Sequence, residues 1–323
     1  MNRLRISVAM CTYNGARFLP KQLESIAAQT RVPDELVVCD DRSTDGCVEI
    51  TKRFARHEPF AVRLEINESN LGSTKNFEKA IGLCQGEIIA LADQDDVWYP
   101  NKLERIEATF LARPSIGVAF SDADVVGEGQ IPLGYRLWRS VGFSLAQQKG
   151  ITNGRCTQLL LNHNVVTGAT MAFHARFRDL VLPIPKSWVH DAWIALLVSA
   201  ITDFAVIGEP LVQYRQHAEQ QIGPLNFTIA ERFARAKRTG ADNYCALAQQ
   251  FTAARERLLT ADDNSRIQAV IPQFEMKIKH LKTRARMDTK RLSRLPRILE
   301  ELLSRRYHRY SKGWKSAAKD LLF

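Results

Sequence analysis

The chain has 323 residues, of which 45% are hydrophobic and 25% are charged, an ordinary composition for a globular protein. The most apolar stretch, Ile194–Ile201, is much shorter than the roughly 20 residues that a bilayer-spanning helix needs, which argues against an integral membrane protein. No apolar leader follows the first residues, so we expect a cytoplasmic protein.

The formal net charge of +10 is concentrated near one end. Residues 231–323 hold 22 Lys and Arg against 10 Asp and Glu, whereas the rest of the chain is slightly acidic. This asymmetry predicts an anionic partner for the carboxyl-terminal region, either nucleic acid or anionic lipid.

The first hundred residues alternate between short apolar strands and amphipathic helices. We predict strands at 5–11, 35–39, 62–66 and 87–92, and helices at 16–29, 45–56 and 72–84. Buried strands separated by helices indicate an α/β fold, with a mostly parallel central sheet flanked by helices. In such sheets, ligands bind beyond the carboxyl ends of the strands.

The later elements are less regular. Residues 116–185 lack a long period; beyond them we predict a helix at 191–200 and strands at 204–207 and 211–214, and within them a strand at 168–173. From about residue 226 the pattern becomes helical and basic. We therefore predict a main domain over residues 1–225 and a basic helical region over residues 226–323.

Three aspartates follow the strand predicted at 87–92. Asp93, Asp95 and Asp96 lie within four positions, and their mutual repulsion costs stability unless a cation offsets it. Carboxylate oxygens suit Mg²⁺ or Mn²⁺, which take further oxygens from water or a substrate diphosphate. A plain surface turn is the alternative, but the position after a buried strand favours a metal site.

Two further polar segments follow the first two strands. After the second strand, Asp40 offers a carboxylate to a base or ribose, and Asp41 lies beside it. The residues expected to cap the following helix are Ser43, Thr44 and Asp45. After the first strand, the segment MCTYNG places backbone N–H groups where a nucleotide can meet them, although this signal is weak by itself.

The segments CTYNGARFLPKQLESIAAQT, LVVCDDRSTDG, NLGSTKNFEKAI and LADQDDVWYPNKLE, in this order, resemble family 2 glycosyltransferases of the GT-A fold. Within that family the chain resembles a bacterial group described as rhamnosyltransferase-like, which elongates cell-surface polysaccharides. The resemblance extends over residues 5–220. It implies an inverting, metal-dependent enzyme that moves a sugar, rhamnose or another hexose, from a nucleotide-diphosphate donor to a saccharide or lipid-linked saccharide acceptor.

The resemblance also assigns roles on the donor side. It implies a nucleotide-sugar-binding half over residues 1–115 and an acceptor-side half over residues 116–225. Asp93 and Asp95 match the DxD motif, with Asp95 as the more direct metal ligand and Asp96 close behind. The residues implied to hold the donor are Thr12, Tyr13, Asn14, Asp40, Asp41 and Asp93.

Two later motifs complete the implied site. WVHDAW makes Asp191 the candidate general base, although a charge at a helix N-terminus is the structural alternative. YRQH makes His217 a candidate metal ligand or phosphate contact, although a lone histidine is more often structural. Arg42 departs from the family, which usually has Gly there, so Arg42 is strained if the turn requires a positive φ.

The basic carboxyl-terminal region has two interpretations. Its apolar residues recur at helical spacing among Arg and Lys, which predicts either a helical cap on the catalytic domain or an interfacial amphipathic segment. Near the end, Trp314 stands among Lys312, Lys315 and Lys319, a composition that suits lipid headgroups. Peripheral contact with the inner face of the cell membrane is therefore one expectation.

Two other functions remain as alternatives. A nucleotidyltransferase acting on sugar phosphates usually opens with a Gly-rich basic loop, whereas this chain has only Gly15 in CTYNGAR. A nucleic-acid-binding protein fits the sequence pI of 9.4, but the half with the aspartates is slightly acidic. We therefore expect no nucleic-acid partner.

Overall fold

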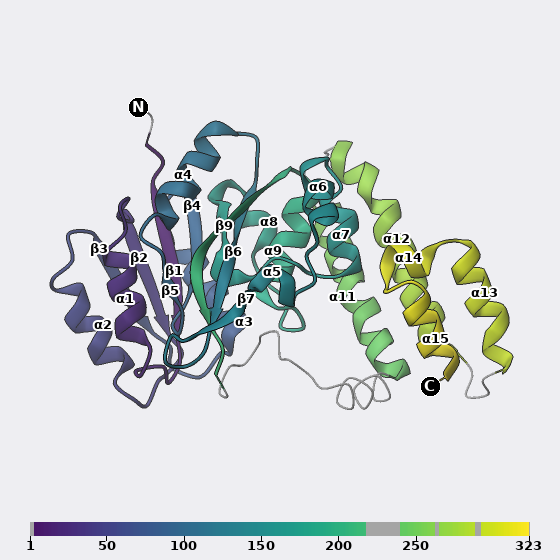
Figure 1. The fold of residues 1–323 in the computed structure, drawn as a ribbon, viewed down its shortest axis with the longest axis horizontal. Coiled ribbons are helices and arrows are strands. Elements are labelled where there is room, and N and C mark those ends of the chain that lie inside the picture. Colours follow the sequence, from purple (N-terminus) through teal and green to yellow (C-terminus); the bar gives the residue numbers. More distant parts are fainter. Residues whose placement is uncertain (1–2, 218–239, 262–264, 288–291, 323) are drawn as a thin grey trace. The chain divides into compact units, whose positions relative to one another are not determined.

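The computed structural model describes residues 3–217, 240–261, 265–287 and 292–322 (Figure 1). The chain divides into two compact units. Unit 1 comprises Met1–Gly154 and Val165–Gly223, and unit 2 comprises Arg155–Asn164 and Pro224–Phe323. The domain boundary predicted between residues 225 and 226 lies outside the described residues.

Unit 1 is built on one mixed sheet. In the described part of the chain, its strands follow the order β3-β2-β1-β4-β8-β6-β9-β5, with β7 paired to β6. The strands are β1 (Ile6–Thr12), β2 (Glu35–Asp40), β3 (Ala61–Ile66), β4 (Ile88–Asp93), β5 (Val97–Trp98), β6 (Val118–Val126), β7 (Pro132–Arg136), β8 (Met171–His174) and β9 (Phe204–Arg215). The fold is the predicted α/β class.

The register of the parallel strands brings their carboxyl ends together. β1 pairs in parallel with β2 on one side and β4 on the other, and Cys11 is the partner of both Cys39 and Asp93. Thr12 likewise pairs with Asp40. Three of the predicted site residues therefore lie at one edge of the sheet because of backbone register alone.

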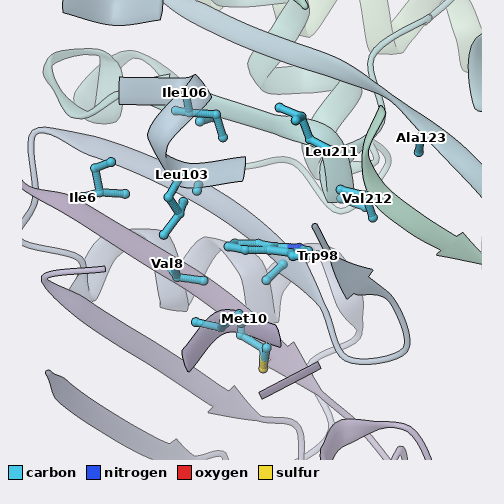
Figure 2. Close-up of a cluster of buried hydrophobic side chains, with 14 of the residues drawn as sticks. Ile6, Val8, Met10, Trp98, Leu103, Ile106, Ala123, Leu211 and Val212 are labelled. Atoms are coloured by element: carbon cyan, nitrogen blue, oxygen red, sulfur yellow. The ribbon is translucent and has the colours of Figure 1, made fainter. Parts of the chain in front are cut away.

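Helices cover both faces of this sheet. Ile6, Val8 and Met10 of β1 point to one face, where they join a buried cluster with Leu103 and Trp98 (Figure 2). The helix α3 packs on β1 and β2. The helices of unit 1 are α1 (Leu19–Ala27), α2 (Cys47–Ala55), α3 (Ser73–Leu83), α4 (Lys102–Ala112), α5 (Leu137–Ser140), α6 (Leu145–Thr152), α8 (Arg178–Val181) and α9 (His190–Ser199), with 3-10 turns η1 (Gly168–Thr170) and η2 (Ala175–Phe177).

The region of weak periodicity contains a central strand. β6 pairs with β8, β9 and β7, and its segment VAFSDADVV is buried through most of its length although it carries two aspartates. The predicted strand at 168–173 begins only at Met171, after the turn η1. The two strands predicted at 204–207 and 211–214 form one strand, β9, whose register against β6 shifts at Pro210.

Unit 2 is helical and contains buried ion pairs among its apolar side chains. Its elements are α7 (Cys156–Asn162), α11 (Ala241–Leu259), α12 (Ser265–Ala285), η3 (Leu292–Arg294), α13 (Leu295–Leu303), α14 (Arg306–Tyr310) and α15 (Trp314–Leu322). Arg284 donates to Asp320 at 2.6 Å, and Arg306 donates to Glu301 at 2.9 Å. Pairing of this kind satisfies charges that would otherwise be costly to bury.

A helix crosses a bilayer only if it has about 20 predominantly apolar residues. Among the described helices, none is both long enough and apolar enough to cross a membrane.

Candidate active site

The three aspartates predicted as a metal site lie where β4 gives way to β5. Asp93 is the last residue of β4, and Asp95 and Asp96 form the turn that follows. Burial, reinforced by the neighbouring carboxylates, raises the pKa of Asp93 and of Asp96 above the ordinary value for aspartate. The carboxylate of Asp93 has no hydrogen-bond or ion-pair partner among the described residues. The cluster therefore carries negative charge that the protein only partly offsets.

A buried lysine supplies part of the countercharge. Lys102 begins α4 with no solvent exposure, donates to the carbonyl oxygen of Ala169 at 2.7 Å, and lies 3.6 Å from the centre of the Trp98 ring. Burial lowers the pKa of Lys102, and the charges of Asp96 and Asp93 oppose this shift. We did not expect this residue from the sequence, since a lysine in the first turn of an amphipathic helix ordinarily faces solvent.

Asp96 is directed into the protein. Its Oδ1 accepts the backbone N–H of Arg215 at 2.9 Å, while its Oδ2 is buried and has no partner among the described residues. Asp96 therefore fastens the turn to β9. Its unpaired buried oxygen also adds to the uncompensated charge of the cluster.

The end of β9 completes this corner of the site. Arg215 is buried; its Nε donates to the carbonyl oxygen of Asp95 at 2.6 Å, and its guanidinium also donates to the carbonyl oxygen of Glu128. His217 Nε2 lies 2.7 Å from Asp95 Oδ2, and the ring of His217 packs on Phe18 with centroids 4.9 Å apart. The structure thus brings together Asp95 and His217, which are 122 positions apart in the sequence.

The acidic corner offers few protein ligands for a cation. In the described part of the chain, no three His, Cys, Asp or Glu side chains are arranged to hold a metal ion by themselves. Mg²⁺ in enzymes is usually held by only one or two carboxylates, the rest of its shell being water and substrate phosphate. Asp95 and His217 in contact, with the unpartnered carboxylate of Asp93 nearby, fit a cation of this kind.

Two hydrogen bonds join the loop after β1 to the acidic turn after β4. The backbone N–H of Tyr13 donates to Gln94 Oε1 at 2.8 Å, and Gln94 Nε2 donates back to the carbonyl oxygen of Tyr13 at 3.0 Å. A Cβ on Gly15 would fall 2.2 Å from the Gln94 side chain, so only glycine permits this approach. The side chain of Tyr13 remains exposed. The role of Gln94 was not predicted from the sequence, in which it is the one residue of the segment 93–96 that is not an aspartate.

The aspartates after β2 are already engaged within the protein. Asp40 is fully buried and accepts hydrogen bonds from Thr12 Oγ1 at 2.7 Å and from the backbone and side chain of Ser43. Asp41 accepts the backbone N–H groups of Leu71 at 2.7 Å and Gly72 at 2.9 Å, as well as the side chain of Asn67. These bonds shape the edge of the site.

The predicted capping of the second helix by Ser43 and Thr44 is wrong, whereas Asp45 Oδ1 accepts the N–H of Cys47, the first residue of that helix, at 3.0 Å. α2 begins at Cys47 after Gly46, and neither Ser43 nor Thr44 caps it. Instead, Ser43 Oγ accepts the N–H of Asn14 at 3.0 Å, and Thr44 donates its N–H to Asn14 Oδ1 at 2.8 Å. Both residues are occupied in joining the β1 and β2 loops, which accounts for the failed prediction.

Two residues of these loops adopt left-handed backbone conformations. Arg42 has φ 64° and Asn14 has φ 46°. Asparagine tolerates this region, whereas arginine is strained there by about 1–2 kcal/mol. The condition stated for Arg42 from the sequence is therefore met.

Asp191 is the second residue of α9. Its Oδ2 accepts the backbone N–H of Gly168 at 2.9 Å, and burial raises its pKa to about 6. The charge of Asp191 contributes to the raised pKa of Asp93, so the two carboxylates act on one another. Gly168 permits this arrangement because a Cβ there would fall 2.8 Å from His190 Nε2.

The residues around Asp191 are mostly part of the core. Trp193 is buried and donates its indole N–H to the carbonyl oxygen of Val181 at 2.8 Å, and Trp188 packs against it. The ring of Trp193 therefore belongs to the core. His190 stacks on Phe77 at 3.9 Å, and burial lowers its pKa to about 3, so its ring stays neutral.

The site combines groups suited to cation binding with a group suited to accepting a proton. The acidic corner of Asp93, Asp95 and His217 can hold a cation and, through it, phosphate oxygens, whereas the partly buried Asp191 can accept a proton near neutral pH. Backbone groups of Tyr13 and the β2 loop border the same edge.

The chain is similar in sequence to known glycosyltransferases. Residues 7–171, just over half of the chain, match the family model described as Glycosyl transferase family 2. An uncharacterised glycosyltransferase of Nostoc sp. is 35% identical over 115 residues, which are 36% of this chain and 35% of that relative. The chain therefore covers only about a third of that relative's length.

Two solved structures share the fold. The first is S. aureus TarS 1–349 in complex with UDP-GlcNAc, with a TM-score of 0.58, 19% identity, and coverage of 85% of this chain and 72% of that TarS 1–349 chain. The second is the mannosyltransferase PcManGT of Pyrobaculum calidifontis in complex with GDP-Man and Mn²⁺, with a TM-score of 0.53, 19% identity, and coverage of 93% and 76%. Both likenesses establish the GT-A fold.

Proposed function

Because the chain belongs to glycosyl transferase family 2, we propose that it transfers a sugar from a nucleotide-diphosphate donor to a saccharide or lipid-linked saccharide acceptor. The observation that carries this proposal is the acidic corner at the end of β4, which faces a proton-accepting aspartate at the start of α9. The solved relatives TarS and PcManGT, with UDP-GlcNAc and GDP-Man, support a nucleotide-sugar donor.

The donor's nucleoside is proposed to lie over the ends of β1 and β2. Thr12, Tyr13 and Asn14 form one border, and Asp40 and Asp41 shape the other through the hydrogen bonds that they accept. The diphosphate is proposed to reach the acidic corner at Asp93 and Asp95. A divalent cation fits this placement, because a diphosphate would otherwise be repelled by the aspartates.

Asp95 and His217, with Asp93 beside them, would hold Mg²⁺ or Mn²⁺, which supplies Lewis-acid neutralisation of the departing diphosphate. Asp191 accepts the proton of the acceptor hydroxyl as that oxygen forms a bond to the anomeric carbon. The bond from the anomeric carbon to the diphosphate oxygen breaks, and its electron pair leaves with the nucleotide. A single displacement of this kind inverts the anomeric centre.

A screen of donors tests the proposal. UDP-, dTDP- and GDP-sugars are compared by thermal shift, each with and without Mn²⁺. We expect one nucleotide class to raise the melting temperature only with the metal, since the aspartates repel the free diphosphate. dTDP-rhamnose is the first donor to test, given the resemblance to rhamnosyltransferase-like enzymes of cell-surface polysaccharide synthesis. Stabilisation by no donor, or equal stabilisation without metal, contradicts the proposal.

We also propose that unit 2 contacts an anionic membrane surface. α13 exposes Leu295, Leu299 and Leu303 along one side, and Trp314 is exposed at the start of α15 next to Lys315. Apolar and aromatic side chains among cations are typical of interfacial helices. The protein should float with vesicles that contain phosphatidylglycerol and not with phosphatidylcholine alone; equal flotation on both contradicts this placement at the inner face of the membrane.

A further inference from the structure

Unit 2 contains a cationic hollow that the proposed transfer does not use. It has a volume of about 660 Å³ and is bordered by α11, α12 and α13. Five cationic side chains line it: Arg255, Lys279, Lys282, Arg286 and Arg297. The only acids in its lining, among the described residues, are Glu275 and Glu300.

The positive charge of this hollow is poorly balanced. Glu300 is engaged by Arg306 at 2.9 Å, and Glu275 lies 4.0 Å from Arg255. Lys279, Lys282 and Arg286 have no anionic partner in the described part of the chain. Lys279 and Lys282 lie three residues apart on α12, and Arg286 follows four residues later, just after the last residue of the helix; lining one hollow, these like charges repel. An anion in the hollow would relieve this repulsion.

The type of anion follows from the donors. Guanidinium groups come from α11, from α13 and from Arg286, which directly follows α12. The Nε of Arg255 is buried with no hydrogen-bond partner among the described residues. Guanidinium groups bind phosphate oxygens in a bidentate manner, and ammonium groups add point charges. Arg and Lys converging from three helices can surround a phosphate more completely than a planar carboxylate.

A second hollow of about 460 Å³ adjoins the first and shares Lys282 and Arg286 with it. Its walls include Ala248, Ala253 and Ala285, which offer apolar surface next to the cations. We propose that the cationic hollow binds a phosphate group, either free or carried by a lipid whose first apolar atoms enter the second hollow. This site is separate from the donor site, so the inference does not depend on the proposed function.

Binding to the full chain tests this site. Inorganic pyrophosphate is titrated calorimetrically with a chelator present, because without a divalent cation the acidic corner of unit 1 repels the probe. Vesicles of phosphatidylcholine with and without phosphatidic acid form the second arm. The test variant is Lys282→Gln with Arg286→Gln, which alters both hollows. The matched control is Arg305→Gln with Arg309→Gln, which removes the same charge from exposed positions of unit 2 outside the hollows and outside the proposed membrane contact.

We expect the test variant to bind at least tenfold more weakly than the wild type in one arm, while the control changes by less than threefold. Loss of pyrophosphate binding identifies a free phosphate ligand, and loss confined to phosphatidic acid vesicles identifies a lipid headgroup. The proposal is overturned if the wild type binds neither probe, or if both variants lose binding equally. Donor-induced stabilisation, measured in parallel, should be unchanged in both variants, so failure here leaves the proposed transfer untouched.

Discussion

Two pairs of aspartates lie at the ends of β2 and β4, the two strands that flank β1, and the surrounding protein bonds to them very differently. At the end of β2, each carboxylate oxygen of Asp40 and Asp41 accepts at least one hydrogen bond from the protein. At the end of β4, Asp93 has no partner among the described residues, and Asp95 is met by a histidine that can itself bind metal. Aspartates at the end of a buried strand therefore have a structural role at β2 and are available to bind a ligand at β4.

The difference lies in what the carboxylates can still do. Hydrogen bonds from backbone N–H groups satisfy the β2 aspartates and hold the loops that surround them. Carboxylates without such bonds repel one another, which destabilises the protein until a ligand arrives. The aspartates at the end of β2 therefore stabilise the fold, whereas those at the end of β4 are left for ligand binding.

The largest expected effect is on the proposed base. Asp191→Asn keeps an oxygen that can accept the Gly168 N–H but removes the proton acceptor, so kcat should fall by about 10²–10⁴-fold. Steady-state kinetics with the donor found by the screen, together with a melting curve, measures both quantities. An unchanged kcat in a folded variant would remove Asp191 from the mechanism.

The second prediction concerns pH. Burial raises the pKa of Asp191 to about 6, and only the ionised form can take a proton. kcat/KM should therefore rise with pH up to about 6 and then level, falling roughly tenfold for each unit below that value. A profile that stays flat down to the ordinary aspartate range would show that another group is the base.

The third prediction addresses the scaffold pair. Asp41→Asn replaces a charged acceptor of two backbone N–H groups, so the free energy of unfolding should fall by about 1–3 kcal/mol. Chemical denaturation measures this change, and donor affinity should stay within a few fold of wild type. Weaker donor binding with unchanged stability would reverse the comparison and favour direct nucleoside contact.

The smallest expected effect is at Arg42. Arg42→Gly relieves the left-handed strain of this turn, and we expect an increase in stability of up to about 1 kcal/mol. The larger conformational freedom of glycine in the unfolded chain offsets part of the gain. A lower melting temperature for the variant would show that the arginine side chain makes a compensating contribution.

Much of this architecture could be predicted from local pattern. The alternation of strands and helices up to residue 93 depends on short apolar runs, and the acidic turn depends on an apolar strand that ends in carboxylates. The strand β6 was not predicted, because Asp122 and Asp124 interrupt its apolar pattern. Asp122 is accommodated by accepting the backbone N–H groups of Ala123 and Trp138, which only the tertiary structure supplies.

The site residues divide in the same way. Asp93, Asp95 and Asp191 could be named because carboxylates at strand ends or helix starts are visible in the sequence. Lys102 and Arg215 could not, because their importance comes from burial against residues distant in the sequence. Lys102 donates to the carbonyl oxygen of Ala169, and Arg215 lies over the ring of Phe18. Sequence pattern also could not distinguish the satisfied aspartates of β2 from the unsatisfied ones of β4.

The central claim is that the acidic corner at the end of β4 binds a divalent cation. Electron paramagnetic resonance of free Mn²⁺ measures this directly in three proteins: wild type, Asp95→Asn and Asp41→Asn. Each variant converts one carboxylate into an amide, so they are matched in chemistry. With nucleotide present, we expect Asp95→Asn to weaken Mn²⁺ binding at least tenfold and Asp41→Asn to leave it nearly unchanged. Equal Mn²⁺ binding by all three proteins, or none by the wild type, would contradict the account.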